Sequence, residues 1–112
     1  MEILFIIFIA LHGFFHLLAF MKSFNMVTIN QLKVDINKAF GVGFLIAFTF
    51  FAFLIMMYAY KSTNWWVYGI FGAVISQVLV IKYWKEAKYG TIPNLIILWI
   101  CVLAFAEHYL IT

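Results

Sequence analysis

Four long apolar runs with few charges decide what this chain can fold into. They cover residues 3–21, 39–60, 65–84 and 92–111. About 20 residues at a rise of about 1.5 Å each match a hydrocarbon core of about 30 Å, so each run predicts a transmembrane helix. With 68% hydrophobic and 10% charged residues, the chain is also more apolar than a soluble domain. The sequence therefore predicts one all-α domain over 1–112, an integral membrane four-helix bundle.

Lysines between the runs predict how the helices cross the membrane. Six lie in or beside the first and third connections and one lies in the second: Lys22, Lys33, Lys38, Lys82, Lys85 and Lys88 against Lys61. Short connections rich in lysine stay in the cytoplasm by the positive-inside rule. We therefore expect connections 22–38 and 85–91 to be cytoplasmic, both termini to face outward, and the bundle to run up-down-up-down. The first run lacks a basic start and a cleavage site, so we expect it to stay in the mature chain.

The connections carry local signals of their own. The segment Thr28-Ile29-Asn30-Gln31 has the form of a capping box and predicts a short interfacial helix over 28–37, either a connector or a contact for lipid or a partner. Before the fourth run, Gly90 is expected to end one helix and Thr91 to cap the next, with Pro93 in its first turn. The short turn 61–64 makes the second and third helices antiparallel neighbours.

Two histidines one helical turn apart, His12 and His16, interrupt the first apolar run. An imidazole inside a membrane is costly and often marks a site or a pathway. We estimate depth in the membrane by counting residues from the cytoplasmic boundary of each run. Both histidines and several polar side chains of the other runs come out about 9–17 Å from that boundary. The sequence thus predicts one polar layer that binds a ligand, formed by His12, His16, Gln77, Thr49 and Ser76. The third histidine, His108, comes out at about 24 Å and is not expected to join it.

What this layer would hold is left open between a proton, a metal ion and a small polar or quinone-like ligand. His12 and His16 could give a metal two nitrogens and Cys101 a third ligand, but a closed zinc site requires four ligands. Haem held by two histidines would need His16 and His108 at one depth, and they differ by about 15 Å. The alternative is that the histidines only join helices through interhelical hydrogen bonds. No activated nucleophile stands out, so an enzyme is not expected and no catalytic residue is assigned.

Small residues at four-residue spacing predict where helices approach closely, as lipid offers little hydrophobic drive for association. The ladders are Ala39, Gly43 and Ala47 in the second run, and Gly69 with Ala73 and Gly72 with Ser76 in the third. They could join these two helices or make a homo-oligomer. Besides the lipid bilayer, the expected partners are a second copy or another membrane protein. Seven lysines without any arginine disfavour nucleic acid. A rival function is therefore a non-catalytic accessory or assembly subunit of a membrane complex.

Two segments resemble a family of small four-span bacterial membrane proteins that carries no assigned activity. They are His12-Gly13-Phe14-Phe15-His16-Leu17 and Glu86-Ala87-Lys88-Tyr89-Gly90-Thr91-Ile92-Pro93-Asn94, with Ser76-Gln77 between them. The resemblance spans nearly the whole chain and implies a multi-pass protein of the bacterial inner membrane. It also implies that both histidines and an interface loop with Glu86, Lys88, Thr91 and Asn94 belong to one pattern. This chain departs from it with Glu at position 86, where Asp is usual, and with Pro at position 93.

Overall fold

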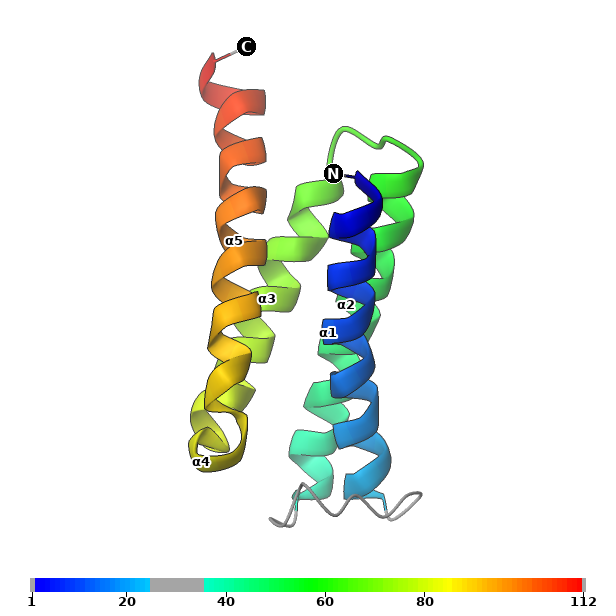
Figure 1. The fold of residues 1–112 in the computed structure, drawn as a ribbon, viewed down its shortest axis with the longest axis vertical. Coiled ribbons are helices and arrows are strands. Elements are labelled where there is room, and N and C mark those ends of the chain that lie inside the picture. The colour runs from blue at the N-terminus through cyan, green and yellow to red at the C-terminus, as the bar shows by residue number, and fades with distance from the viewer. Residues whose placement is uncertain (1, 25–35, 112) are drawn as a thin grey trace.

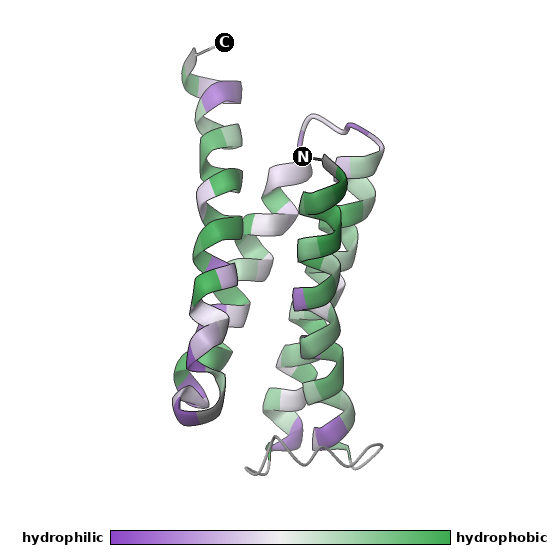
Figure 2. Ribbon diagram, in the orientation of Figure 1, coloured by the Kyte–Doolittle hydropathy of each residue, from purple (hydrophilic) through white to green (hydrophobic). Residues whose placement is uncertain are grey.

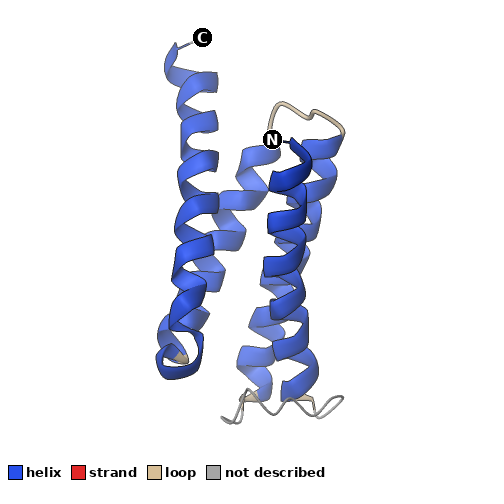
Figure 3. Cartoon of the chain, viewed as in Figure 1, coloured by secondary structure: helices blue, strands red, loops and turns tan. Residues whose placement is uncertain are grey.

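The computed structural model describes residues 2–24 and 36–111, and all its regular structure there is helical (Figure 3). The elements are α1 (Glu2–Ser23), α2 (Lys38–Ala59), α3 (Trp65–Lys82), α4 (Trp84–Ala87), the 3-10 turn η1 (Lys88–Gly90), α5 (Thr91–Ala106) and the π-helical turn η2 (Glu107–Ile111). Four stretches are long and apolar enough to cross a membrane: Ile3–Ser23, Lys38–Ala59, Trp65–Lys82 and Lys88–Leu110. The predicted all-α class and the four membrane-length helices are confirmed.

The molecule is elongated, with extents of 47 × 23 × 23 Å. Among the four long helices, each packs closely against the next one along the chain: α1 with α2, α2 with α3, and α3 with α5. The start of α1 and the turn η2 lie toward the same end of the long axis as the turn between α2 and α3, and α4 lies at the other end (Figure 1). Hydrophobic residues cover most of the helices, and hydrophilic ones gather toward the ends (Figure 2). This distribution is what a lipid core demands of a spanning helix.

The turn between α2 and α3 ends α2 with a paired hydrogen-bond pattern. The amide of Ser62 donates to the Met57 carbonyl at 2.9 Å, and the amide of Lys61 donates to the Tyr58 carbonyl at 3.1 Å. Lys61 has a φ of 58°, in the left-handed region. Together these features form a Schellman motif, with lysine at a position that glycine usually occupies. The motif turns the chain back within a few residues, so α3 packs along α2.

The first and third connections differ in part from the sequence-based expectation. The structure ends α3 at Lys82, two residues before the end of the predicted run 65–84, and two short turns, α4 and η1, lie between α3 and α5. Gly90 occupies the N-cap position of α5, so no side chain caps this helix. Thr91 is the first residue of the helix. The predicted role of Thr91 as a cap is therefore wrong. Most of the predicted interfacial helix 28–37 lies outside the described residues, and Asn37 instead caps α2 by accepting the Ala39 amide at 2.8 Å.

Small residues hold α2 and α3 close together, as the ladders predicted. A methyl group added to Gly43 would lie 3.1 Å from the Leu79 side chain of α3. One added to Gly72 would lie 3.1 Å from Phe51 and 3.2 Å from Phe50 of α2. Large apolar side chains elsewhere point outward, and α5 is the least covered of the four long helices. In a membrane, these outward faces contact acyl chains.

Candidate functional site: a polar network between three spans

The two histidines of α1 lie on its inward face. His12 is 7% exposed and His16 5%, whereas Phe14 and Phe15 between them face outward. The ring of Phe51 on α2 covers both imidazoles edge to face, with centroids 5.2 Å from His12 and 5.3 Å from His16. The i, i+4 spacing therefore aims both rings toward the same interior region, where α2 offers only apolar contacts to them.

His16 is held by a backbone acceptor on one side and a hydroxyl on the other. Its Nδ1 lies 2.8 Å from the His12 carbonyl, which can only accept, so Nδ1 carries the hydrogen. In the neutral ring Nε2 is then an acceptor, and the Ser76 hydroxyl of α3 donates to it at 2.5 Å. Ser76 is fully buried. These two bonds assign His16 the Nδ1–H tautomer.

His12 begins a longer chain of hydrogen bonds that crosses to α5 and α3. Its Nε2 donates to Asn94 Oδ1 of α5 at 2.7 Å. Asn94 Nδ2 donates to Gln77 Oε1 of α3 at 3.0 Å, and Gln77 Nε2 donates to the Thr91 hydroxyl at 3.1 Å. We call the set formed by His12, His16, Ser76, Gln77, Thr91 and Asn94 the polar network. It connects α1 to α3 and α5, the two helices with which α1 does not pack closely along its length.

One ring nitrogen stays outside this bonding pattern. None of the hydrogen bonds between described residues uses His12 Nδ1. Every described side-chain nitrogen or oxygen that is sealed inside the protein has a partner. Nδ1 is therefore not sealed, in agreement with the remaining 7% exposure of His12. In the neutral Nε2–H tautomer this atom presents an available lone pair.

The structure brings together four of the five residues predicted for the polar layer: His12, His16, Ser76 and Gln77. It leaves Thr49 out. That side chain faces outward from α2, and its hydroxyl donates to the Leu45 carbonyl of its own helix at 2.9 Å. Residue counting gives depth along the helix and says nothing about the direction of the side chain. Thr49 therefore has no contact with the histidines.

The three predicted metal ligands do not form one group, because Cys101 does not join the two histidines. Cys101 is fully buried, but it lies against Gly69 and beside Leu54, away from the two imidazoles. Within residues 2–24 and 36–111, no three side chains of the His, Cys, Asp and Glu types form a group that could hold a metal ion. His16 also has both ring nitrogens engaged. This donor set does not fit a zinc or haem site.

Asn94 and Thr91 are the members of the network that residue counting missed. The family resemblance places both in an interface loop, with Glu86 and Lys88. Asn94 is 2% exposed and begins the buried stripe of α5, which continues with Ile97 and Cys101. The spacing of three and seven residues from Asn94 is the sequence signal for that inward face. Lys88 is exposed beside the Tyr89 ring, and the side chain of Glu86 lies outside the described part.

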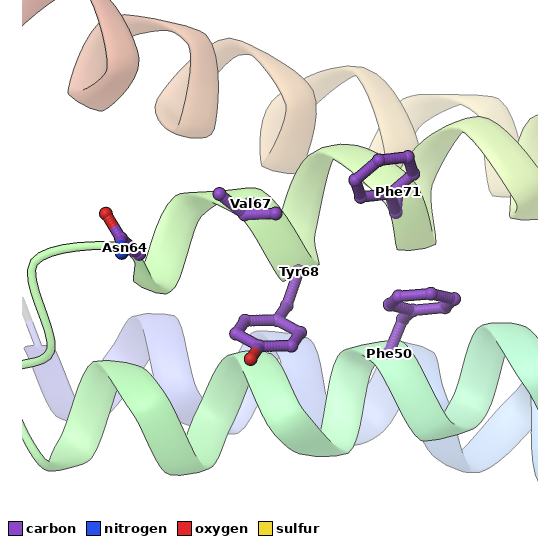
Figure 4. Close-up of a pocket in the computed structure, with 5 residues that line it drawn as sticks. All are labelled: Phe50, Asn64, Val67, Tyr68 and Phe71. Atoms are coloured by element: carbon purple, nitrogen blue, oxygen red, sulfur yellow. The ribbon is translucent and has the colours of Figure 1, made fainter. Parts of the chain in front are cut away.

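His108 lies away from the network, as expected. It belongs to an aromatic group near the end of α5, with ring centroids 4.6 Å from Tyr109 and 6.3 Å from Trp66. A pocket of about 330 Å³ lies at the same end of the molecule between α2 and α3 (Figure 4). It is lined by Phe50, Asn64, Val67, Tyr68 and Phe71. None of its lining residues belongs to the polar network.

The pair formed by Ser76 and His16 has the spacing of a nucleophile and its base, but its surroundings do not suit that chemistry. A nucleophilic hydroxyl must reach a substrate, and Ser76 is 0% exposed. The arrangement can instead hold helices together and exchange a proton at imidazole nitrogen. No protein-family model, curated protein or solved structure matches this chain.

Proposed function

We propose that this chain is a small multi-pass protein of the bacterial inner membrane that takes up and releases a proton at the His12–His16 pair. The observation that carries the proposal is the uncommitted His12 Nδ1 within an otherwise hydrogen-bonded buried network. Imidazole is the side chain suited to exchange protons between pH 5 and 8, and ionisable groups inside spans commonly serve such pathways.

A proton suits this site better than a larger ligand. It needs no cavity, only a lone pair and surroundings that tolerate the new N–H. The pocket between α2 and α3 offers no histidine to a quinone-like molecule. A metal ion would find no third ligand among the described side chains. The network therefore supports proton binding over the other two ligand classes.

For the orientation in the membrane we propose cytoplasmic connections at 22–38 and 85–91 and outward termini. The six-to-one distribution of lysines supports this arrangement. Lys82, Lys85 and Lys88 lie at or after the end of α3, and Lys61 lies at the opposite turn. Single cysteines at Lys61 and Lys85, in a Cys101→Ala background, would be tested with an impermeant thiol reagent on intact cells. Labelling of position 61 alone is expected, and labelling of position 85 alone would overturn the orientation.

The proton site is tested by nuclear magnetic resonance of ¹⁵N-histidine in the full-length protein in lipid nanodiscs. His12→Asn, His16→Asn and His108→Asn variants assign the three rings. Between pH 4 and 9, we expect the His12 nitrogens to change from the neutral to the charged pattern reversibly while the helical circular dichroism stays constant. If neither His12 nor His16 changes in the folded protein, the proposal is wrong.

A second candidate is an accessory or assembly subunit in which the histidines only join helices. The observation in its favour is that every sealed polar side-chain atom of the described residues already has a partner. Mild solubilisation with an affinity tag should then return a stable membrane partner in fixed ratio. Purification of the lone protein, together with a titrating His12, would favour proton binding instead.

A further inference from the structure

Among the described residues, a single chain of hydrogen bonds holds the His12 Nε2. It runs from His12 through Asn94 and Gln77 to Thr91. Asn94 Oδ1 is the acceptor of that N–H, and the amide nitrogen of Asn94 is already engaged by Gln77. We propose that these three residues act as a positioning unit, which holds His12 in the Nε2–H tautomer and leaves Nδ1 as the atom that takes the proton. This inference rests on the proposed function.

The chain of amides has two self-consistent directions. In the direction that the structure has, each donor points from His12 toward Thr91, whose hydroxyl accepts the last bond. If both amides turned over, Thr91 would donate to Gln77, Gln77 to Asn94, and Asn94 to a bare His12 Nε2. A hydroxyl can serve either direction, as it is both donor and acceptor. The direction of the chain and the tautomer of His12 are therefore linked.

Only the direction found in the structure accepts a charged His12. Both nitrogens of an imidazolium are donors, so Nε2 must face an acceptor such as Asn94 Oδ1. The network is thus arranged in advance for proton uptake at Nδ1. The proton arrives from hydronium, which leaves as water, and a new Nδ1–H bond forms.

Few ionisable groups lie near His12, so few neighbours could change its charge state by their own titration. It faces the ring of Phe51 from α2 and Asn94 from α5, and neither titrates. Ser76 from α3 faces His16. His16 itself, on α1, is the one ionisable group in contact with His12 among the described residues, with ring centroids 4.6 Å apart. A change at His12 after substitution in the amide chain can therefore be assigned to that chain.

Thr91→Val is the sharpest test because it removes one acceptor at the far end without touching either histidine. Gln77 Nε2–H would then point at a methyl group. The bond from Gln77 to Thr91 is part-buried, and an N–H without a partner is rarer in proteins than a carbonyl with a spare lone pair, so turning both amides over is favourable. The reversed chain presents Asn94 Nδ2–H to His12 and requires the Nδ1–H tautomer. Gln77→Met removes the middle link and predicts the same change.

The measurement is the ratio of the two neutral His12 tautomers, read from ¹⁵N shifts at alkaline pH in nanodiscs. We expect Nε2–H to dominate in the wild type, and Thr91→Val to shift the ratio about three- to tenfold toward Nδ1–H, the effect of one hydrogen bond. Thr49→Val is the matched control, because its hydroxyl bonds its own helix. It should leave the ratio unchanged, and His16 should stay Nδ1–H in all variants.

The outcomes separate this inference from the proposed function. If His12 titrates but folded Thr91→Val and Gln77→Met keep the wild-type ratio, the positioning unit is wrong and proton binding stands. A wild-type His12 that is already mainly Nδ1–H would also overturn the inference. If the ratio shifts as expected but neither buried histidine titrates, the amide chain still sets the tautomer of His12, but the proposed function and the role of Nδ1 in proton uptake both fall.

Discussion

Helices are joined in two different ways on the two sides of α3. Toward α2, the contact is made by shape: Leu79 lies over Gly43, and the rings of Phe50 and Phe71 stack with centroids 5.8 Å apart. Toward α1, the contact is made by a hydrogen bond between His16 and the buried hydroxyl of Ser76. We call the side of α3 that packs against α2 the fitted side, and the side that is hydrogen-bonded to α1 the bonded side.

The difference reflects what can hold helices together in lipid. Acyl chains are as apolar as leucine, so association depends on close packing and on polar bonds rather than on removal of water. Packing suits α2 and α3, which a short turn already brings together. The polar network connects α1 to α3 and α5, which are distant in sequence and not pressed against it along their length. Bonds of defined direction fix that arrangement and at the same time provide the proposed proton site.

The largest loss of stability is expected at Gly69, where α3 packs closely against both α2 and α5. A methyl group there would overlap Cys101 Sγ of α5 and approach Leu54 of α2. We expect Gly69→Val to lower the free energy of unfolding by about 2–3 kcal/mol, as overpacking does. The measurement is denaturation by sodium dodecyl sulfate in mixed micelles, followed by circular dichroism.

Two further variants decide whether crowding is the cause. Gly69→Ala with Cys101→Ala should recover much of the loss of Gly69→Ala alone, because the second change removes the overlapping sulfur. Ala10→Val, on the exposed face of α1, is the control and should be near neutral. Equal losses for Gly69→Ala with and without Cys101 would contradict the fitted contact.

The bonded side should give a smaller but coupled loss. His16→Leu and Ser76→Ala each remove one partner of the same bond, and interhelical bonds in membranes average about 0.6 kcal/mol with a maximum near 1.7. We expect single losses of about 1 kcal/mol and a double variant less damaging than their sum. A double-mutant cycle by the same denaturation assay measures this coupling. Strict additivity would mean that the bond contributes nothing to stability.

The turn between α2 and α3 offers a way to strengthen the fitted side. Lys61 adopts a left-handed conformation that costs a side chain about 1 kcal/mol and glycine little. Because glycine also gains freedom in the unfolded chain, we expect Lys61→Gly to stabilise by about 0.5 kcal/mol. Thr63→Gly in the same turn is the control. Its φ is not positive, so glycine there should destabilise.

The sequence predicted the spans because a membrane requires long apolar helices whatever the fold. The same composition hides which face of each helix is inward. Thr49 and Ser76 have similar depths along their helices, yet only Ser76 faces a histidine. The family resemblance places Asn94 in an interface loop, but it bonds His12 in the middle of the first span. The spacing of Asn94, Ile97 and Cys101 marks the inward face of α5. The sequence does not give the tilt and offset of one helix against another, and these decide which polar residues meet.

The smallest effect is expected at Thr49, and its size tests the division between bonded and fitted contacts. The hydroxyl of Thr49 donates to Leu45 of its own helix, and the side chain is exposed. Thr49→Val keeps the shape, so the free energy of unfolding should change by less than about 0.5 kcal/mol. If Thr49 instead belonged to the polar layer, as its depth alone suggested, the loss would match that of Ser76→Ala and the His16 nitrogen shifts would move. Constant shifts and constant stability would show that depth without direction does not make a residue part of the site.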